Sequence, residues 1–560
     1  CIDGKPSAPY PAEPYELGIL GTLPPGLEFA GAGGPVKPAD FYEPCAPRSR
    51  ILVVRSSAAW CGPCLWHAGH TKRFMEDPRL AGRVVLVDLL LADEDNMPAT
   101  PAALARWREK IDLAGPTLAV DPKNTFGPAQ LAHAPLPGYV LIDTRTMQIV
   151  TTLADPDPET LVARIDLELA DADKRPRPRL PSPTLIDGHF TENEMDLVRG
   201  MKLGAAAPPP DPTNEYADDP AAAALGKVLF SDALLSPSGT VSCATCHDPA
   251  HGLTDGTNQS TGVAKGDRNS PPIALSAHSR WQFWDGRADT LWMQALGPFE
   301  DAKEFGGSRL FVAQQIVKRH ASQYAAVFGA KYPLPDLASL PASGKPGDPA
   351  FDALTPADKE KVTRIFVNAG KAIAAFERAM RVKPNALDRY IDGDVSALTS
   401  PQKHALALFL RNGCAQCHWG PRLTDDAFHV LRFPTGRQDG KADLGREDGL
   451  LKLAAAEFRA SSTWSDSPSS AKLFNVDAPS MLGAFKTPTL RGLSTSGPFG
   501  HGGTLATLLD VTQHYSGRGL KHGDPLAAGT TEQWVPSFDM NVVHDLPAFL
   551  EVLTADVELP

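Results

Sequence analysis

Short apolar runs alternate with amphipathic stretches over the first third of the chain. Ile51–Val54, Val84–Val87 and Tyr139–Ile142 are rich in β-branched or aromatic residues, and their length and composition predict buried strands. Segments near 65–75, 101–110 and 158–170 have the character of helices. Because strands alternate with helices, this part of the chain is predicted to form an α/β layer.

The hydrophobic pattern changes beyond residue 225, where the strand signal fades. Helices are expected at 286–296, 310–328, 357–382, 401–411 and 544–554. The second part of the chain is therefore predicted to be mostly helical with long loops.

Segments rich in Pro, Gly and Ala divide the chain into predicted domains. At roughly 150 residues per domain, a chain of 560 residues should hold three or four. The predicted fold class is multidomain, with an α/β domain followed by two mostly α-helical subdomains. The expected ranges are an N-terminal tether over 1–40, the α/β domain over 41–173, a linker over 174–224, and the helical subdomains over 225–395 and 396–560.

Composition and charge narrow the class of partner. Apolar content of 42% and charged content of 21% are ordinary for globular protein. The net charge of −12 argues against nucleic acid or anionic lipid, and would attract a small basic protein such as a carrier cytochrome. No apolar run reaches the 18 or so residues of a membrane helix.

The chain begins with Cys1. A mature chain with this first residue resembles a bacterial lipoprotein, in which the Cys carries the lipid. We therefore expect a periplasmic protein attached to the membrane only through a lipid on Cys1. The alternatives are an arbitrary start of the sequence and a Cys1–Cys45 disulfide in an oxidising compartment.

Two copies of Cys-x-x-Cys-His carry the strongest chemical signal. In each copy two thiols can bond to the haem vinyl groups while the adjoining His ligates the iron. A zinc knuckle is the alternative, but no second ligand pair follows at finger spacing. The sequence thus predicts two covalently bound c-type haems, on Cys243, Cys246 and His247 and on Cys414, Cys417 and His418.

A dithiol motif, Trp60-Cys61-Gly62-Pro63-Cys64, stands between a predicted strand and a predicted helix. At a helix N-terminus the thiolate of Cys61 is favoured, and Cys64 can resolve a mixed disulfide formed by Cys61. Residues 45–170 resemble the TlpA-like branch of the thioredoxin fold, which implies that Pro137 is the cis-proline facing the dithiol. The Thr that usually follows this proline is replaced by Gly138. A purely structural disulfide is the alternative, and the role of the dithiol as reductant, oxidant or sensor is open.

Several motifs follow one another between residues 225 and 560: Phe283-Trp284-Asp285-Gly286-Arg287-Ala288, Gln294, Gly297-Pro298, Glu304, Lys486-Thr487-Pro488-Thr489-Leu490-Arg491 and Phe499-Gly500-His501-Gly502-Gly503. In these motifs and in their order, the region resembles the bacterial dihaem cytochrome c peroxidase and MauG family.

The resemblance implies unequal roles for the two haems. The haem with proximal His247 is the peroxide site, where Glu304 is the acid–base group and Gln294 orients the peroxide. Trp284 lies between the haems and carries electrons. The haem with His418 serves electron transfer, and its far ligand is Tyr515, at a position where the peroxidase branch has Met. Tyr is the MauG pattern, and the neighbouring His514 is the rival ligand.

Two further expectations follow from the resemblance. Peroxidases of this family often have a loop His that blocks the peroxide haem, but here that position falls near Thr261 and no His lies between His251 and His278. We therefore expect the first haem to react with peroxide without prior reduction. The family also holds calcium, which implies oxygen ligands from Asn269, Ser496 and Pro498.

The predicted function is that of a MauG-type dihaem peroxidase, which reduces hydrogen peroxide and oxidises a protein donor or substrate. The alternatives are peroxide detoxification with a carrier cytochrome as donor, and an electron-transfer or thiol–disulfide module without peroxidase activity. The electron-transfer alternative conflicts with Glu304 and Gln294, because a simple carrier needs no acid–base group.

Overall fold

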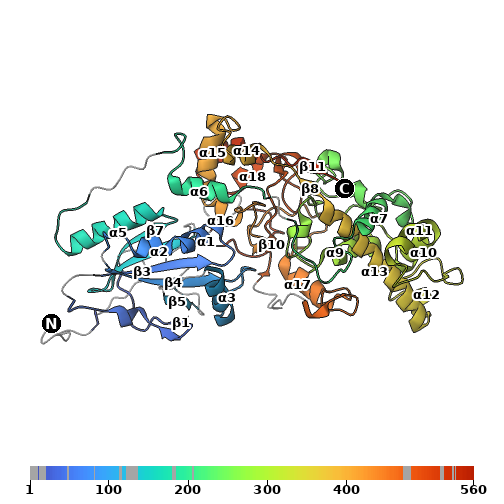
Figure 1. Cartoon of the computed structure of the whole chain (residues 1–560), viewed down its shortest axis with the longest axis horizontal. Helices are drawn as coiled ribbons and strands as arrows, with labels where there is room; N and C mark the ends of the chain where they lie inside the picture. Colours follow the sequence, from blue (N-terminus) through green and yellow to red (C-terminus); the bar gives the residue numbers. More distant parts are fainter. Residues whose placement is uncertain are drawn as a thin grey trace. The chain divides into compact units, whose positions relative to one another are not determined.

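The computed structural model describes the chain except residues 1–9, 12–20, 47–49, 81, 112–116, 122–125, 127–135, 179–184, 205–206, 471–480, 517–522, 533–534 and 536–537. Cys1, on which the lipid was predicted, lies outside the described residues. The fold consists of two compact units, each discontinuous in sequence (Figure 1). The first unit contains Cys1–Lys202, Tyr390–Ala427 and Thr531–Phe549, and the second contains Leu203–Arg389, Phe428–Thr530 and Leu550–Pro560.

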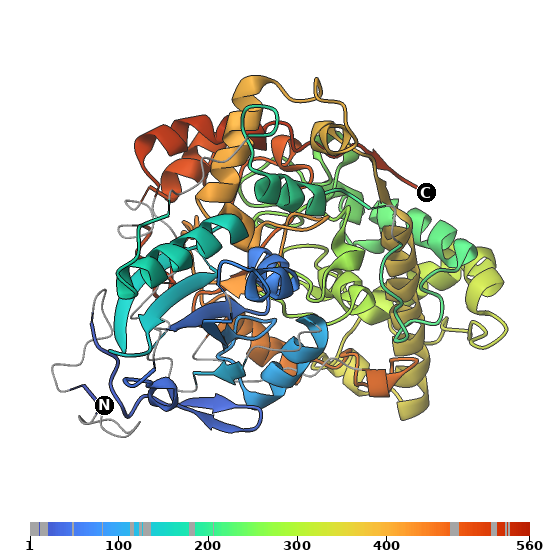
Figure 2. The same cartoon turned by 60° about the vertical axis from the view of Figure 1, so that its left-hand side comes forward.

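A mixed seven-stranded sheet is the centre of the first unit (Figure 2). Its strand order is β2-β1-β5-β4-β3-β6-β7, with β3 parallel to β4 and antiparallel to β6. Every residue of β3 is buried, as expected for a strand covered on both faces. The strands are β1 Phe29–Gly31, β2 Gly34–Val36, β3 Ile51–Ala58, β4 Val84–Ala92, β5 Thr117–Val120, β6 Gly138–Asp143 and β7 Gln148–Ala154.

The helices of the first unit complete a thioredoxin-like fold. The dithiol follows β3 directly, at the start of α1, and the antiparallel pair β6–β7 follows later in the chain. The helices are α1 Gly62–Gly69, α2 Thr71–Met75, α3 Pro101–Ile111, α5 Pro158–Ala172, α6 Glu192–Gly200, α15 Ser400–Arg411, α16 Cys414–Cys417 and α20 Met540–Asp545.

Two predicted ranges need correction. Part of the region 1–40 belongs to the sheet and not to a tether, because β1 pairs with β5 and the side chain of Phe29 is only 1% exposed. The predicted linker 174–224 contains α6, whose first turn is stabilised by a capping box between Thr191 and Glu194.

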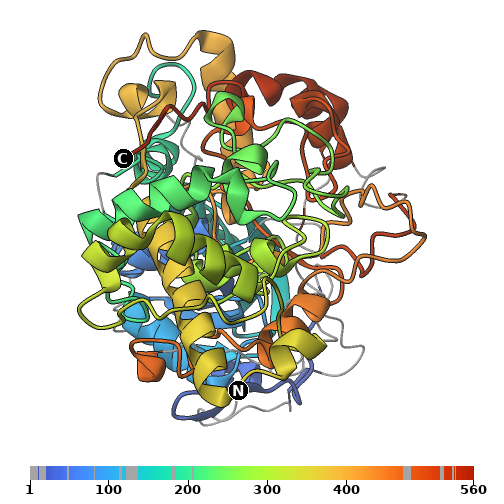
Figure 3. The same ribbon diagram turned by 90° about the vertical axis from the view of Figure 1, so that its right-hand side faces the viewer.

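The second unit is built around the long helix α13, Pro356–Ala379 (Figures 1 and 3). This helix packs against α7, α9 and α10. A Cβ on Gly226 of α7 would lie 2.0 Å from the carbonyl oxygen of Ala372, so these two backbones approach as closely as only glycine permits. The other helices are α7 Pro220–Ser231, α8 Cys243–Cys246, α9 Leu291–Glu300, α10 Arg309–Arg319, α11 Ala321–Phe328, α12 Pro349–Asp352, α17 Arg446–Ala455 and α18 Leu508–His514.

The helix expected over 286–296 starts later than predicted. Thr290 is the N-cap of α9, and its side chain accepts a hydrogen bond from the backbone of Met293. The helix expected over 310–328 is two helices separated at His320. Among the described residues, no helix combines the length and apolar character needed to span a membrane.

Candidate haem, peroxide and dithiol sites

The two haem-attachment motifs share one local geometry. The Nδ1 atom of His247 lies 3.0 Å from the carbonyl oxygen of Leu253, and that of His418 lies 3.1 Å from the carbonyl oxygen of Leu423. An Nδ1–H donated to a carbonyl fixes the tautomer and leaves Nε2 to ligate a metal. Each motif therefore presents two thiols and one oriented imidazole, which is the donor set that a c-type haem requires.

Glu304 is a half-buried residue whose backbone is fixed by the neighbouring loop. Its carbonyl oxygen accepts a hydrogen bond from Val263 over 2.9 Å, and a Cβ on Gly262 would lie 2.3 Å from the same oxygen. Burial and the nearby Asp301 raise the pKa of Glu304 to about 7, against the opposing charge of Arg287. A carboxyl with this pKa can both accept and donate a proton at neutral pH.

The loop that holds Glu304 includes Thr261. An isolated bridge pairs Thr261 with Lys265, and the N–H of Ala264 donates to the carbonyl of Lys303 over 2.9 Å. Thr261, the position at which the resemblance predicts a blocking His, therefore lies in a loop bound to the Glu304 segment.

Gln294 and Trp284 lie in adjoining parts of the second unit. Gln294 is half-buried on the first turn of α9, the helix that precedes Glu304 in the chain. Trp284 is half-buried, and its indole N–H donates to the carbonyl oxygen of Asn269 over 2.9 Å. No direct contact joins Gln294 to Glu304 among the interactions described for these residues.

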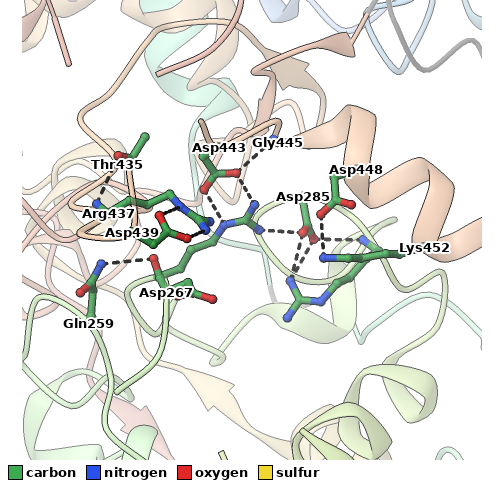
Figure 4. A network of polar contacts seen from close by, with 12 residues as sticks. Gln259, Asp267, Asp285, Thr435, Arg437, Asp439, Asp443, Gly445, Asp448 and Lys452 are labelled. Atoms are coloured by element: carbon green, nitrogen blue, oxygen red, sulfur yellow. Dashed lines mark hydrogen bonds and ion pairs between the residues drawn. The ribbon is translucent and has the colours of Figure 1, made fainter. Parts of the chain in front are cut away.

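A charged network fixes the segment that carries Trp284 (Figure 4). Arg268 donates to Asp285 over 2.6 Å and to Asp443 over 2.6 and 3.0 Å. Burial alone would raise the pKa of Asp285, but Arg287 and Arg268 hold this pKa well below its usual range. Asp285 is therefore an anion at neutral pH. Arg268 joins this residue, which follows Trp284 directly, to the loop that carries Asp443.

Glu377 is a functional candidate that sequence reasoning missed. It lies on α13, is 4% exposed, and accepts a hydrogen bond from the hydroxyl of Ser276 over 3.2 Å. Burial raises the pKa of Glu377 to about 8. After burial itself, the charges of Glu377 and Glu304 contribute most to raising the pKa of the Cys243 thiol, so both carboxyls act on the first haem motif. In sequence Glu377 resembles a solvated charge on an amphipathic helix, and only its burial distinguishes it.

Tyr515 and its rival His514 differ in their surroundings. His514 is 5% exposed, its Nε2 lies 2.8 Å from the carbonyl oxygen of Leu431, and its ring lies 4.2 Å from that of Phe433. Tyr515 follows at the C-cap of α18 and is half-buried. Because His514 is engaged with backbone, Tyr515 is the better candidate ligand. Tyr515 belongs to the second unit and His418 to the first.

The residues predicted to bind calcium offer oxygen donors. The side-chain nitrogen of Asn269 donates to the carbonyl of Thr257 over 2.8 Å, so its amide oxygen points away from that carbonyl. The backbone N–H of Asn269 donates to the carbonyl of His501 over 2.8 Å, close in sequence to Ser496 and Pro498. One amide oxygen with backbone carbonyls is a donor set that suits a hard cation such as calcium.

The dithiol lies inside the first unit. Cys61 and Cys64 form a disulfide, both are 0% exposed, and Cys61 is the N-cap of α1. The Leu136–Pro137 peptide bond is cis, and the Sγ of Cys61 lies 3.8 Å from the carbonyl oxygen of Leu136. Pro137 is thus next to the residue that contacts the sulfur.

A buried ion pair lies in the sheet beside the dithiol helix and was also missed. Arg55 and Asp88 are direct partners in the β3–β4 register, and their side chains are 1% and 0% exposed. Arg55 also donates to the hydroxyl of Thr71 over 2.7 Å, which ties the pair to α2. The sequence signal for this ion pair was one charged residue of opposite sign within each of two apolar runs. Two buried charges can be accommodated when the strands pair and bring them together.

Two haem-attachment motifs, with a carboxyl of raised pKa near one of them, are the features expected of a dihaem peroxidase. The family described as di-haem cytochrome c peroxidase matches residues 220–396. The methylamine utilization protein MauG of Methylorubrum extorquens is 33% identical over 340 residues, which cover 60% of this chain and 79% of that protein. The cytochrome-c peroxidase IdrP1 of Denitromonas iodatirespirans is 31% identical, covering 63% of this chain and 86% of that protein. The cytochrome c551 peroxidase of Nitrosomonas europaea is 26% identical, covering 60% of this chain and 80% of that protein.

The chain belongs to the dihaem cytochrome c peroxidase and MauG family. The resemblance predicted from sequence is confirmed. Membership makes the chain a peroxidase-type oxidoreductase with two covalently bound haems, and it implies hydrogen peroxide and a protein partner.

Proposed function

We propose that this chain is a MauG-type peroxidase, which reduces hydrogen peroxide at the haem on Cys243 and Cys246 and oxidises a protein through the second haem. The observation that carries the proposal is Glu304, a carboxyl whose pKa is raised to about 7 by burial near the first haem motif. A simple electron carrier has no use for such a group.

The haems supply the redox chemistry when bound, and the side chains around them control protons and access. Glu304 takes a proton from one peroxide oxygen and returns it to the other as the O–O bond breaks. Gln294 orients the peroxide by hydrogen bonding. Thr261 replaces the blocking His and leaves access open, so that peroxide can react with the diferric protein.

Cys414, Cys417 and His418 would hold the second haem, for which Tyr515 is the proposed further ligand, and this haem together with Trp284 would pass oxidising equivalents to the protein donor. Phenolate is a hard anionic donor that favours ferric iron, so it lowers the potential of the second haem relative to thioether. Calcium bound by Asn269, Ser496 and Pro498 stabilises the second unit. We place the protein in the periplasm, outside the cytoplasm, where c-type haems are attached.

Rapid mixing of diferric protein with peroxide tests the proposal. The haem absorption spectrum should change within seconds, and Glu304→Gln should slow that change by about 10²–10⁴-fold. Glu360→Gln is the matched control, because Glu360 is an exposed carboxyl on α13 of the same unit. A spectrum that responds only after one haem has been reduced would contradict the MauG assignment.

The second candidate function is peroxide removal with a carrier cytochrome as donor. It is favoured by the cytochrome c peroxidases among the relatives. Steady-state turnover with reduced cytochrome c, at a rate comparable to the peroxide reaction itself, would support it over oxidation of a protein substrate.

A further inference from the structure

The second haem motif lies against the dithiol motif within the first unit. Trp419 follows the haem ligand His418 directly in sequence. A Cβ on Gly62, the residue after Cys61, would lie 2.5 Å from Cε3 and 2.7 Å from Cβ of Trp419. The indole therefore lies in van der Waals contact with the backbone of the dithiol motif, at a place where only glycine leaves room for it.

Trp419 is held in this position from its other side. Its indole N–H donates to the carbonyl oxygen of Leu197 over 2.9 Å, and a Cβ on Gly200 would lie 2.3 Å from its Cζ2. Two glycines, one on α1 and one on α6, thus enclose one indole ring. A side chain fixed by two close contacts and a hydrogen bond has a defined position between the haem motif and the dithiol.

The rest of the haem segment packs into the core around the dithiol. Ala427 is 0% exposed in the apolar cluster that includes Cys61 and Cys64, and Cys417 packs against that cluster. The C-terminal segment covers the motif as well, since the indole of Trp60 donates to Asn96 and Asn96 donates to Glu532, each over 2.8 Å. The dithiol is therefore enclosed by the segments that carry the second haem.

Burial of both sulfurs is unusual for a dithiol that acts on proteins. Thiol–disulfide exchange requires a thiolate to reach a disulfide of the partner directly. Cys61 and Cys64 are 0% exposed, which prevents that approach in this conformation. Electron transfer needs no such access, because packed side chains and backbone can connect the two centres.

We infer that the Cys61–Cys64 dithiol exchanges electrons with the haem on Cys414 and Cys417 through Trp419, and is the internal electron donor for peroxide reduction. This inference rests on the proposed peroxidase function and names its donor. The dithiol domain is then neither a separate enzyme nor a structural appendage.

The reaction balances in atoms and electrons. Oxidation of the dithiol breaks two S–H bonds and forms one S–S bond, releasing two electrons and two protons. Those electrons and protons reduce one hydrogen peroxide to two water molecules. Two molecules of a small thiol, which need less room to reach the sulfurs than a protein thiolate does, regenerate the dithiol by exchange, are themselves oxidised to one disulfide, and close the cycle.

Electron exchange between the dithiol and the haems can be tested without peroxide, by starting from two preparations that differ in which centre is reduced. Two electrons per anaerobic protein are placed either on the dithiol, with a phosphine, or on the two haems, with dithionite. Haem absorption and alkylation of Cys61 and Cys64 after an acid quench then report where the electrons reside. Both preparations should relax to the same haem spectrum and the same thiol content.

Three variants show whether Trp419 carries the exchange. Trp419→Leu and Gly62→Ala should each slow the relaxation by about tenfold or more, because one removes the indole and the other displaces it. Trp419→Phe, which keeps an aromatic ring, should slow it less. Gly69→Ala is the matched control on the same helix, because a Cβ there meets nothing within 4 Å.

Addition of one equivalent of peroxide to the dithiol-reduced protein tests the donor role. One disulfide should form per peroxide, and a Cys61→Ser/Cys64→Ser variant should keep its peroxide-altered haem spectrum for longer. If the haems respond to peroxide but the two preparations keep different haem spectra and thiol contents, the inference is wrong and the peroxidase function stands. If the preparations converge but peroxide leaves the haem spectrum unchanged, the exchange stands and both the peroxidase function and the donor role fail.

Discussion

The indole N–H of Trp284 donates a hydrogen bond to the backbone carbonyl of Asn269 over 2.9 Å. This bond joins the residue proposed to carry electrons to the residue proposed to bind calcium. Asn269 is 5% exposed and also bonds to Thr257 and His501. The position of Trp284 is therefore set by the same residue that orders the neighbouring loops.

Trp284→Phe tests this relationship. The variant keeps an aromatic ring but leaves the buried carbonyl of Asn269 without the indole donor, which should cost about 1–3 kcal/mol of unfolding free energy. Denaturant unfolding followed by circular dichroism measures the loss. Oxidation of the protein donor should also slow, while the first spectral response to peroxide persists. An unchanged donor rate would remove Trp284 from the electron path.

The rate of the peroxide reaction should depend on the protonation of Glu304. Glu304 accepts the peroxide proton only when it is deprotonated, and its pKa is raised to about 7. The rate should therefore rise by about tenfold per pH unit below that pKa and level off above it. Stopped-flow absorption from pH 5 to 9 measures the profile. Glu304→Gln should abolish the inflection, and an inflection that survives would belong to another group.

Glu377→Gln should make the second unit more stable at high pH. The pKa of Glu377 is raised from 4.5 to about 8, so the folded state binds this proton more tightly than the unfolded state does. Wild-type stability should then fall as pH rises between those two values and become constant above the higher one. The advantage of the variant should grow over the same window to about 2 kcal/mol, allowing for relaxation around the charge. Denaturant unfolding at pH 5, 7 and 9 gives the comparison, and a difference independent of pH would contradict it.

Arg268→Leu should destabilise the second unit strongly. The variant leaves Asp443, 3% exposed, without its cation, while Asp285 keeps Arg287. Loss of one partner from a buried pair costs about 3–5 kcal/mol. Arg437→Leu is the control in the same region, because Asp439 is 43% exposed and such a pair contributes about 0–1 kcal/mol. Equal losses in the two variants would show that burial does not determine the effect.

Calcium binding should require the side chain of Asn269. Metal analysis should find one calcium per chain in wild type, and Asn269→Ala should lose it. Chelation should lower the thermal midpoint of wild type, since a ligand at a hundred times its dissociation constant stabilises by about 2.7 kcal/mol. Asn541→Ala, at an exposed position, should bind calcium as wild type does. A chelator effect of equal size in Asn269→Ala would place the metal elsewhere.

Several elements followed from local sequence, and others did not. Ile51–Val54 and Val84–Val87 were predicted as strands, but β3 and β4 continue through Arg55 and Asp88. A single-strand pattern treats such charges as strand ends, whereas the paired register lets the two charges neutralise each other. Similarly, β1 has no local periodicity, and it exists because Phe29 is buried against the sheet.

The sequence by itself determined the covalent chemistry of this protein. The spacing of Cys and His within each haem motif, and of Cys61 and Cys64, is local, so it can be recognised without a fold. The tertiary structure alone decided which groups surround that chemistry. The raised pKa values of Glu304 and Glu377 arise from burial, and the contact of Trp419 with Gly62 joins segments distant in sequence. Burial and long-range contact are properties of the folded chain, and no pattern along the sequence specifies them.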